Sequence, residues 1–308
     1  MSKLQNANKM TLGIIANITK ENVADVVSTF IEKLQKNKLD YLLSTDLWKF
    51  RKHFATKIPK HYFLPDKKLC ELSDIIISIG GDGTMLATAF NAQFFDKPVL
   101  GVNLGKLGFL VEANINQMDA IIKEIKTKKY SIEERIVITG SCTGHKIEKL
   151  YAINDIVIDK GAWPKMIELT IIVDGEYVTT FSADGLIIAT PTGSTGYSIS
   201  SGGPIVSPRA DVITLSPISP HSLTIRPLVL PSDQEIVIRA NSLYKEIQVN
   251  CDGQRVFAFP PPFEIKISKS KAPLKLVHTS LTSYFETLRN KLLWGIDLRR
   301  NSLNRKES

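Results

Sequence analysis

Apolar residues follow two different patterns along the chain, and the change between them divides the 308 residues into two parts. In the first part, three apolar runs are long enough for strands buried on both faces: residues 12–17, 74–79 and 98–103. Three other stretches have the pattern of helices: residues 23–34, 84–95 and 118–126. Because these strands and helices alternate, the sequence predicts a Rossmann-like α/β domain, with a parallel sheet covered on both faces.

After about residue 128, strand-like runs replace the helical pattern. Asp174-Gly175 and Asp252-Gly253 each separate two such runs, and Asp-Gly is a strong hairpin signal. We therefore expect a mostly antiparallel β-sandwich. From about residue 282 the pattern is helical again, and the sequence leaves open whether this segment returns to the first domain or covers the second. The expected domains are residues 1–127, 128–281 and the C-terminal segment 282–308.

Residues 49–68 follow neither pattern and are predicted to form a loop or a mobile insertion. This stretch carries seven basic residues: Lys49, Arg51, Lys52, Lys57, Lys60, Lys67 and Lys68. Four more lie near the C-terminus: Arg299, Arg300, Arg305 and Lys306. With a net charge of +8, the surplus suits polyanionic partners such as nucleotides or nucleic acid. A solvated surface with a mobile tail is the simpler interpretation.

Composition restricts the class of protein further. No apolar run reaches the roughly 18 residues of a membrane-spanning helix, and the N-terminus lacks the apolar core of a signal peptide. Cys70, Cys142 and Cys251 are far apart and include no Cys-x-x-Cys, which argues against a disulfide framework or a zinc site. We expect a soluble cytoplasmic protein that does not act at a membrane.

The run "DIIISIGGDGT" ends a predicted strand with three glycines around one acid. Gly80, Gly81 and Gly83 allow backbone N–H groups to approach a ligand closely, and the helix beginning near Thr84 adds the positive end of its dipole. The pattern predicts a phosphate cradle, although it is not a Walker A loop because the Gly-Lys-Ser/Thr ending is absent. Asp82 would repel phosphates unless it binds a metal or takes a proton, and both uses belong to phosphoryl transfer. The plainer alternative is a glycine turn in which Asp82 caps the helix.

A second unusual segment, residues 182–206, runs from a strand into a turn of small hydroxyl residues. The compact donors and acceptors are Thr192, Ser194, Thr195, Ser198, Ser200 and Ser201, and Gly193 and Gly196 permit close approach. Tyr197 offers a flat face and one hydroxyl, which suit a base or a ribose edge. Taken alone, the segment could be an ordinary Ser/Gly-rich surface loop.

Several separated segments resemble the NAD kinase family, in one order from about residue 74 to 262. They are "GGDGTML", "LGKLGFL", "AINDIVI", "SADGLIIATPTGSTGYSISSGGPIV", "PHSLTIRPLVLP" and "NCDGQ". The long fourth segment is highly specific. The resemblance implies an enzyme that uses Mg²⁺ and ATP to phosphorylate the 2′-hydroxyl of the adenosine ribose of NAD, which makes NADP. It also implies phosphate binding by the α/β domain, NAD binding by the sandwich, and a homodimer or homotetramer whose sites are completed by a neighbouring subunit.

The family's functional residues can be carried onto matching positions of this sequence. Asp82 is then the proton acceptor, and Gly80, Gly81, Gly83 and Thr84 surround the phosphates. Asn154 and Asp155 would bind ribose or adenine, and Asp184 would bind the carboxamide end or a ribose. The other residues implied to contact NAD are Gly83, Phe109, Lys165, Thr195, Gly196, Tyr197, Ser198, Ile199, Ser200 and Gln254. No metal ligand is assigned.

Some positions depart from the family pattern. Asp155 is the shorter of the two acids found there, Gly196 stands where alanine is usual, and Ser182 stands where some members have arginine. The last departure leaves one phosphate contact open. Four further residues have plain structural interpretations: Phe109 in the core, Asp252 in a hairpin turn, His221 beside two prolines, and Lys106 as a solvated side chain.

Three other functions compete with this interpretation. A lipid kinase of the diacylglycerol or sphingosine type shares Gly-Gly-Asp-Gly-Thr but usually continues with Pro-x-Gly-Thr-x-Asn-Asp, whereas here Pro98 is followed by "VLGVNLGKLGFL". A dinucleotide-binding regulator without activity would gain nothing from the charge of Asp82. Nucleic-acid binding has no known motif here. We therefore expect NAD and ATP as partners, with polyphosphate or other nucleoside triphosphates as open alternatives to ATP.

Overall fold

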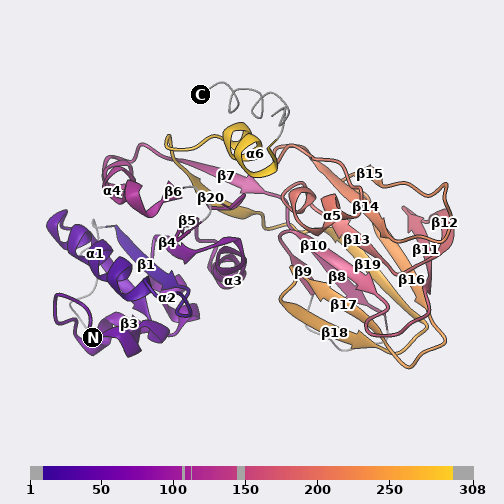
Figure 1. The fold of residues 1–308 in the computed structure, drawn as a ribbon, viewed down its shortest axis with the longest axis horizontal. Coiled ribbons are helices and arrows are strands. Elements are labelled where there is room, and N and C mark those ends of the chain that lie inside the picture. Colours follow the sequence, from indigo (N-terminus) through magenta and orange to yellow (C-terminus); the bar gives the residue numbers. More distant parts are fainter. Residues whose placement is uncertain (1–9, 106–107, 112, 144–149, 294–308) are drawn as a thin grey trace, which may run out of the picture. The chain divides into compact units, whose positions relative to one another are not determined.

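The computed structural model describes residues 10–105, 108–111, 113–143 and 150–293, and these form two compact units (Figure 1). The first unit contains residues up to 133 and the chain from 275 onward, and the second contains residues 134–274. The sequence predicted the first domain boundary between residues 127 and 128 and the second between residues 281 and 282, whereas the chain passes from one unit to the other after residues 133 and 274. The described part of the C-terminal segment, residues 282–293, therefore belongs to the first unit, which the sequence had left open. Lys106 and the basic residues 299–306 lie outside the described residues.

The first unit is built on an eight-stranded sheet of the described residues. Its order is β3 (Phe63–Leu64), β2 (Asp40–Ser44), β1 (Thr11–Ala16), β4 (Ile75–Gly80), β5 (Val99–Asn103), β20 (Leu274–His278) and β7 (Ser131–Arg135), with β6 (Ala113–Asn114) also paired to β5. The pairs from β3 through β5 to β20 are parallel. The Rossmann-like parallel sheet is therefore confirmed.

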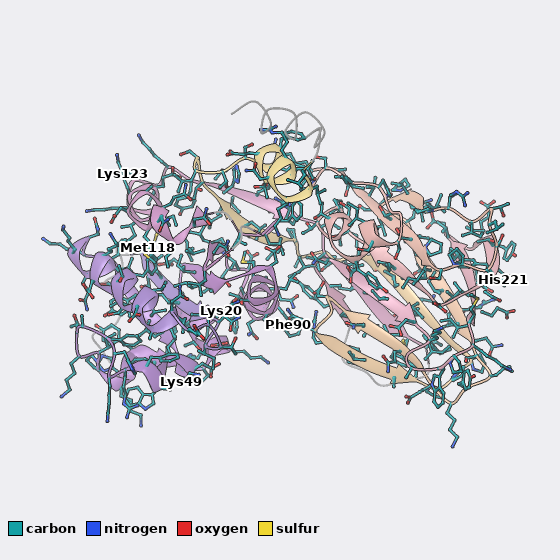
Figure 2. All side chains as sticks on the ribbon, in the orientation of Figure 1. Lys20, Lys49, Phe90, Met118, Lys123 and His221 are labelled. Carbon is teal, nitrogen blue, oxygen red and sulfur yellow. The ribbon has the colours of Figure 1, made fainter. Side chains whose placement is uncertain are left out.

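Helices cover both faces of this sheet. On one face α1 (Val23–Lys36) packs against α4 (Met118–Thr127), and on the other α2 (Asp66–Leu72) packs against α3 (Asp82–Ala92). In α4, Met118 is buried while Lys123 is exposed, as expected of an amphipathic helix (Figure 2). The last helix among the described residues, α6 (Tyr284–Leu292), follows β20, and the Ser283 side chain caps it by accepting a hydrogen bond from the Glu286 N–H.

The second unit is a sandwich of two six-stranded sheets, counted over the described residues, with one shared apolar core. One sheet has the order β15 (Leu228–Pro231), β14 (Val212–Ile218), β13 (Gly185–Ala189), β10 (Asp155–Asp159), β17 (Ile247–Cys251) and β18 (Arg255–Phe259). The other has the order β12 (Glu176–Ala183), β11 (Ile167–Val173), β16 (Ile236–Asn241), β19 (Phe263–Lys269), β8 (Ile138–Cys142) and β9 (Leu150–Ala152). Both Asp-Gly pairs form the predicted hairpin turns, with positive φ at each residue.

Two sequence predictions for the first unit were wrong in detail. Residues 49–68 are not a structureless insertion, because they contain the end of a short 3₁₀ helix, the edge strand β3 and the start of α2. The helix expected from residue 84 begins at Asp82, with Gly81 as its N-cap residue. Asp82 therefore does not cap the helix. Within the part of the chain that the structure describes, no helix is both long and apolar enough to cross a membrane.

Candidate functional site

The carboxyl ends of β1 and β4 are neighbours in the first unit, because these strands pair in parallel. The chain leaves β1 into α1 and leaves β4 into α3, which cover opposite faces of the sheet. This arrangement is a topological switch point, where open α/β sheets bind their ligands. A cavity of about 570 Å³ lies there, lined by the end of β1 and the first turns of α3. That volume is within the range of small-molecule sites.

The glycine turn forms one wall of this cavity. Gly81, Gly83 and Thr84 line it at the N-terminal end of α3, where the positive end of the helix dipole favours an anion. Gly80 does not line the cavity. A Cβ atom on Gly80 would lie 2.4 Å from the Thr84 hydroxyl, so this glycine makes room for Thr84.

Charged side chains complete the wall. Lys20 (Figure 2) follows β1, while Asp46 and Asp66 come from the segment after β2 and from the start of α2. Burial raises the pKa of Asp66, and the nearby charge of Asp46 adds to this, whereas a hydrogen bond from Ser44 opposes it. Two neighbouring carboxylates beside a phosphate cradle are the kind of oxygen ligands that Mg²⁺ takes together with substrate phosphates. No group of three or more His, Cys, Asp or Glu suited to a metal is found among the described residues.

Asp82 points away from the helix axis toward the loop after β5. The Phe109 N–H donates to its Oδ2 at 2.9 Å, and the Leu110 N–H donates to its Oδ1 at 3.1 Å. These two bonds fix the plane of the carboxylate and use one acceptor position on each oxygen, which leaves a second position on each. The side chain is 32% exposed, so a ligand can reach it.

Gly108 is the residue that makes this arrangement possible. A Cβ atom at Gly108 would lie 1.8 Å from Asp82 Oδ1, far inside any allowed contact. The segment "LGKLGFL" was singled out in the sequence for its resemblance, but spacing alone does not show that one of its glycines shapes the space around Asp82. The Phe109 ring is half-buried, and the Lys291 Nζ lies 5.1 Å from its centroid.

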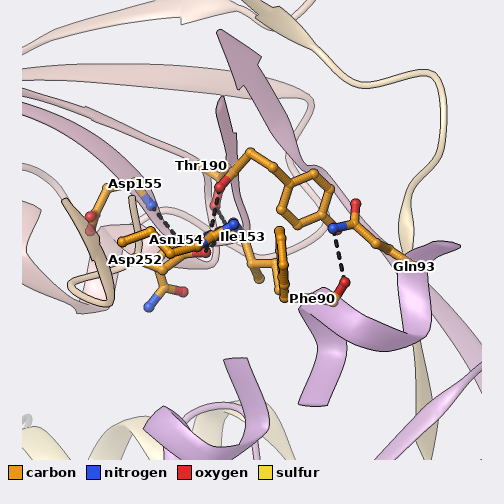
Figure 3. A network of polar contacts seen from close by, with 9 residues as sticks. Phe90, Gln93, Ile153, Asn154, Asp155, Thr190 and Asp252 are labelled. Carbon is orange, nitrogen blue, oxygen red and sulfur yellow. Dashed lines mark hydrogen bonds and ion pairs between the residues drawn. The ribbon is translucent and has the colours of Figure 1, made fainter. Parts of the chain in front are cut away.

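In the second unit, Asp252 holds the Asn-Asp motif through its backbone (Figure 3). Its carboxylate accepts hydrogen bonds from the N–H groups of Ile153 at 2.9 Å, Asn154 at 2.7 Å and Asp155 at 3.4 Å. Arg255 donates to the same carboxylate at 2.9 Å and to the Tyr151 carbonyl at 2.7 Å. The predicted place of Asp252 in a hairpin turn is confirmed, and its buried side chain also positions the motif that follows β9.

Two buried carboxylates therefore lie close together. Burial raises the pKa of Asp155 to about 7, and the charge of Asp252 contributes. Burial also raises the pKa of Asp252, but the three amides and Arg255 oppose the shift. Because the donors favour the charged form of Asp252, a proton taken up by the pair resides on Asp155. The Asn154 side-chain oxygen is buried, and no hydrogen bond among the described residues satisfies it.

The Gly/Thr/Ser-rich segment packs directly on this motif. The Thr190 N–H donates to the Asn154 carbonyl at 2.8 Å, and the Thr190 hydroxyl donates to the Ile153 carbonyl at 2.6 Å (Figure 3). A Cβ atom on Gly193 would lie 2.0 Å from the Asn154 carbonyl oxygen, so only glycine fits there. A Cβ atom on Gly196 would lie 3.2 Å from the Gly193 carbonyl oxygen and 3.8 Å from both Asn154 Nδ2 and Asp155 Oδ2. An alanine there would require a small shift of the turn, which glycine avoids.

The predicted residues after this turn differ in accessibility. Tyr197 and Ser200 are exposed, while Thr195, Gly196 and Ile199 are half-buried. The Ser198 hydroxyl is buried and shares a hydrogen bond of 2.9 Å with Ser216 on β14. Ser198 therefore anchors the segment to the sheet.

Two other predicted residues lie at the far end of β10. Asp155 begins this strand, whereas Asp184 pairs with Lys160, which follows its other end, at 2.7 Å. Five residues of strand separate these ends by roughly 13 Å. Lys165 is exposed in the loop at the same far end, and Gln254 follows β17 at the near end, where Cys251 pairs with Ile156. The His221 side chain is exposed (Figure 2), and the His221 backbone N–H donates a hydrogen bond to the Ser182 carbonyl.

Comparison with known proteins gives matches to both units. A family model described as the ATP-NAD kinase N-terminal domain matches residues 12–130, and one described as the ATP-NAD kinase C-terminal domain matches residues 153–279. An NAD kinase of Chlorobium phaeovibrioides is 38% identical over 287 residues, which cover 93% of this chain and 99% of the relative. An NAD kinase of Geotalea daltonii is 40% identical over 245 residues, which cover 79% of this chain and 86% of the relative.

Solved structures show the same likeness. The crystal structure of yeast NADH kinase complexed with NADH has a TM-score of 0.85 at 25% identity and covers 94% of this chain and 89% of that chain. The crystal structure of an NAD kinase from Archaeoglobus fulgidus in complex with ATP has a TM-score of 0.71 at 28% identity and covers 92% of this chain and 99% of that chain. Neither set of matches supports the lipid kinase or the regulator without activity.

Proposed function

The chain belongs to the NAD kinase family, and we propose that it transfers the terminal phosphoryl group of ATP to the 2′-hydroxyl of the adenosine ribose of NAD, with Asp82 as proton acceptor. Phosphorylation of NAD with ATP follows from the family. The choice of hydroxyl and the roles of individual residues are our proposal. The proposal rests mainly on the geometry of Asp82. Two backbone amides fix its carboxylate, and it lies at the start of α3, where Gly81 and Gly83 line the cavity at the switch point.

A neutral ribose hydroxyl is a weak nucleophile, so transfer is faster when a base removes its proton as the new bond forms. Asp82 has two acceptor positions that its amide partners do not use, and it is partly exposed. Fixing its plane in advance means that little reorganisation is needed during the reaction. Gly81, Gly83 and Thr84 would hold the phosphates of ATP through the start of α3.

Asp46 and Asp66 fit a divalent cation in the same cavity. They supply hard oxygen atoms, and the raised pKa of Asp66 reflects a carboxylate that a cation would stabilise. Mg²⁺ bound there would screen the negative charge of the triphosphate. Lys20 would add a second positive charge beside the phosphates.

In the second unit, Asn154 and Asp155 would bind NAD together with the surface of residues 195–200 and Gln254. The buried Asn154 oxygen fits a donor such as a ribose hydroxyl or the adenine amino group. Asp184 and Lys165 lie at the opposite end of β10 from Asn154 and Asp155. A small ligand bound at one end of this strand does not reach the residues at the other end. This separation supports a homo-oligomer in which a neighbouring subunit brings its Asp184 end to the site. Three free thiols support a reducing cytoplasmic location.

The test is to incubate the purified protein with ATP, Mg²⁺ and NAD, and in a second tube with diacylglycerol as acceptor. We expect NADP in the first tube and no product in the second. Asp82→Asn should bind NAD nearly normally in calorimetry but lose about 10²–10⁴-fold in kcat, the usual contribution of a general base. An Asp82→Asn variant with the full rate would show that the proton acceptor is another group.

A further inference from the structure

The C-terminal helix α6 brings a lysine to Asp82. The helix follows β20, the strand by which the chain returns to the first sheet, and Lys291 is in its last turn. Its Nζ lies 3.9 Å from Asp82 Oδ2 and 5.1 Å from the centroid of the Phe109 ring. The segment "SYFETLRNKLL" carries no phosphate or nucleotide motif, so the sequence does not point to this lysine.

Two groups meet at one oxygen atom of Asp82. Oδ2 accepts the Phe109 N–H at 2.9 Å and faces the Lys291 ammonium, which also lies over the ring of Phe109. The lysine therefore contacts the carboxylate and also the ring of the residue that donates to it. A cation over one face of the ring leaves only the opposite face for a stacked base.

This pair contributes little to stability. The Lys291 and Asp82 side chains are 31% and 32% exposed, and a separation of 3.9 Å is long for a hydrogen bond. Exposed or partly exposed ion pairs typically contribute little to folding. The charge can nevertheless act on the reaction, because its attraction for Oδ2 restricts how the carboxylate turns, and a proton acceptor must be oriented toward the proton that it takes.

We propose that Lys291 is a positioning residue for the reaction, which holds the Asp82 carboxylate in its orientation and fixes the Phe109 ring. The inference rests on the proposed role of Asp82. It differs from a phosphate-binding role, because the ammonium acts through the carboxylate and the ring. Loss of the cation should therefore lower kcat and leave the KM for ATP and for NAD nearly unchanged.

The experiment compares Lys291→Met, Lys291→Arg and the matched control Arg289→Met. Arg289 is exposed two residues earlier in the same helix, so its substitution removes the same charge from the same turn. We expect Lys291→Met to lose about 5-fold in kcat, the upper end of what a partly exposed charge pair contributes, with each KM within about twofold. Lys291→Arg should recover most of the rate, and Arg289→Met should behave as the wild type. Thermal unfolding should be the same for all four proteins.

Three results would overturn the inference: an unchanged kcat in Lys291→Met, an equal loss in Arg289→Met, or a higher KM for ATP at unchanged kcat, which would indicate direct phosphate binding. If Lys291→Met unfolds at a lower temperature than the wild type, the proposal is tested with Lys291→Arg instead. A Lys291→Arg variant that folds as the wild type does but lacks most of its kcat also contradicts the proposal. Asp82→Asn is measured beside them. A slow Asp82→Asn with a fast Lys291→Met would reject only the role of Lys291, whereas a fast Asp82→Asn would reject the proposed function.

Discussion

Gly108→Ala tests the placement of the Asp82 carboxylate without changing any charged group. The new Cβ atom would lie 1.8 Å from Asp82 Oδ1, 2.4 Å from its Cγ and 2.5 Å from a methyl group of Val111. Cβ atoms essentially never approach another heavy atom within 3.0 Å, so the carboxylate must move by more than 1 Å. It would then lose the amide bonds from Phe109 and Leu110.

The magnitude follows from these contacts. A displacement of about 1 Å in a catalytic group can lower the rate about 100-fold. The loss of two hydrogen bonds to a partly exposed carboxylate lowers the free energy of unfolding by about 1–3 kcal/mol. We expect Gly108→Ala to fold, to bind NAD as the wild type does, and to lose about 100-fold in kcat.

Gly105→Ala is the matched control, since a Cβ atom there meets nothing within 4 Å in the same loop. NADP formation is followed at saturating ATP and NAD, and urea unfolding is measured beside it. The reasoning is refuted if Gly108→Ala keeps the wild-type kcat, or if Gly105→Ala is equally slow.

Three further substitutions have defined outcomes. Because the pKa of Asp155 is raised from 3.8 to about 7, the folded chain keeps a proton there that the unfolded chain releases, so the free energy of unfolding falls as pH rises from about 4 to 7. Asp155→Asn should remove this dependence on pH, and its free energy of unfolding, measured with urea at pH 8, should exceed that of the wild type by about 2–4 kcal/mol. A variant whose free energy of unfolding falls with pH as steeply as that of the wild type would contradict this expectation. Asp252→Asn should lower the free energy of unfolding by about 3 kcal/mol, because it breaks a buried pair with Arg255, and an unchanged melting temperature would exclude the positioning role. Asp66→Asn should raise the Mg²⁺ concentration at half-maximal rate about 5-fold or more, since one of two candidate ligands is lost, and a magnesium titration with the wild-type midpoint would argue against this site.

The sequence predicted the elements whose signal is local. The apolar runs that became β1, β4 and β5 are long and continuous, and the two Asp-Gly turns have the positive φ that this dipeptide tolerates. The stretch from β2 to α2 was missed, because β3 has two residues and α2 has seven, too few for either period to be recognised.

The candidate site could be predicted only in part for a similar reason. The glycine turn, Asn154 and Asp155 lie in compact motifs that a reader can find in one segment. Asp82 meets Gly108 and Lys291, which are 26 and 209 positions away along the chain, so only the fold brings them together. Likewise, the hairpin turn gives no sign that the Asp252 side chain binds three amides about 100 residues earlier.

The central claim is that the Asp82 carboxylate receives the proton of the hydroxyl that is phosphorylated. A crystal structure of this protein with NAD and a non-hydrolysable ATP analogue measures this directly, as the distance from the Asp82 oxygens to the 2′-oxygen of the adenosine ribose. The account predicts a distance of about 2.6–3.2 Å, with both amide bonds to the carboxylate retained. A carboxylate turned away from the ribose, with another base within hydrogen-bond reach of the 2′-oxygen, would contradict it.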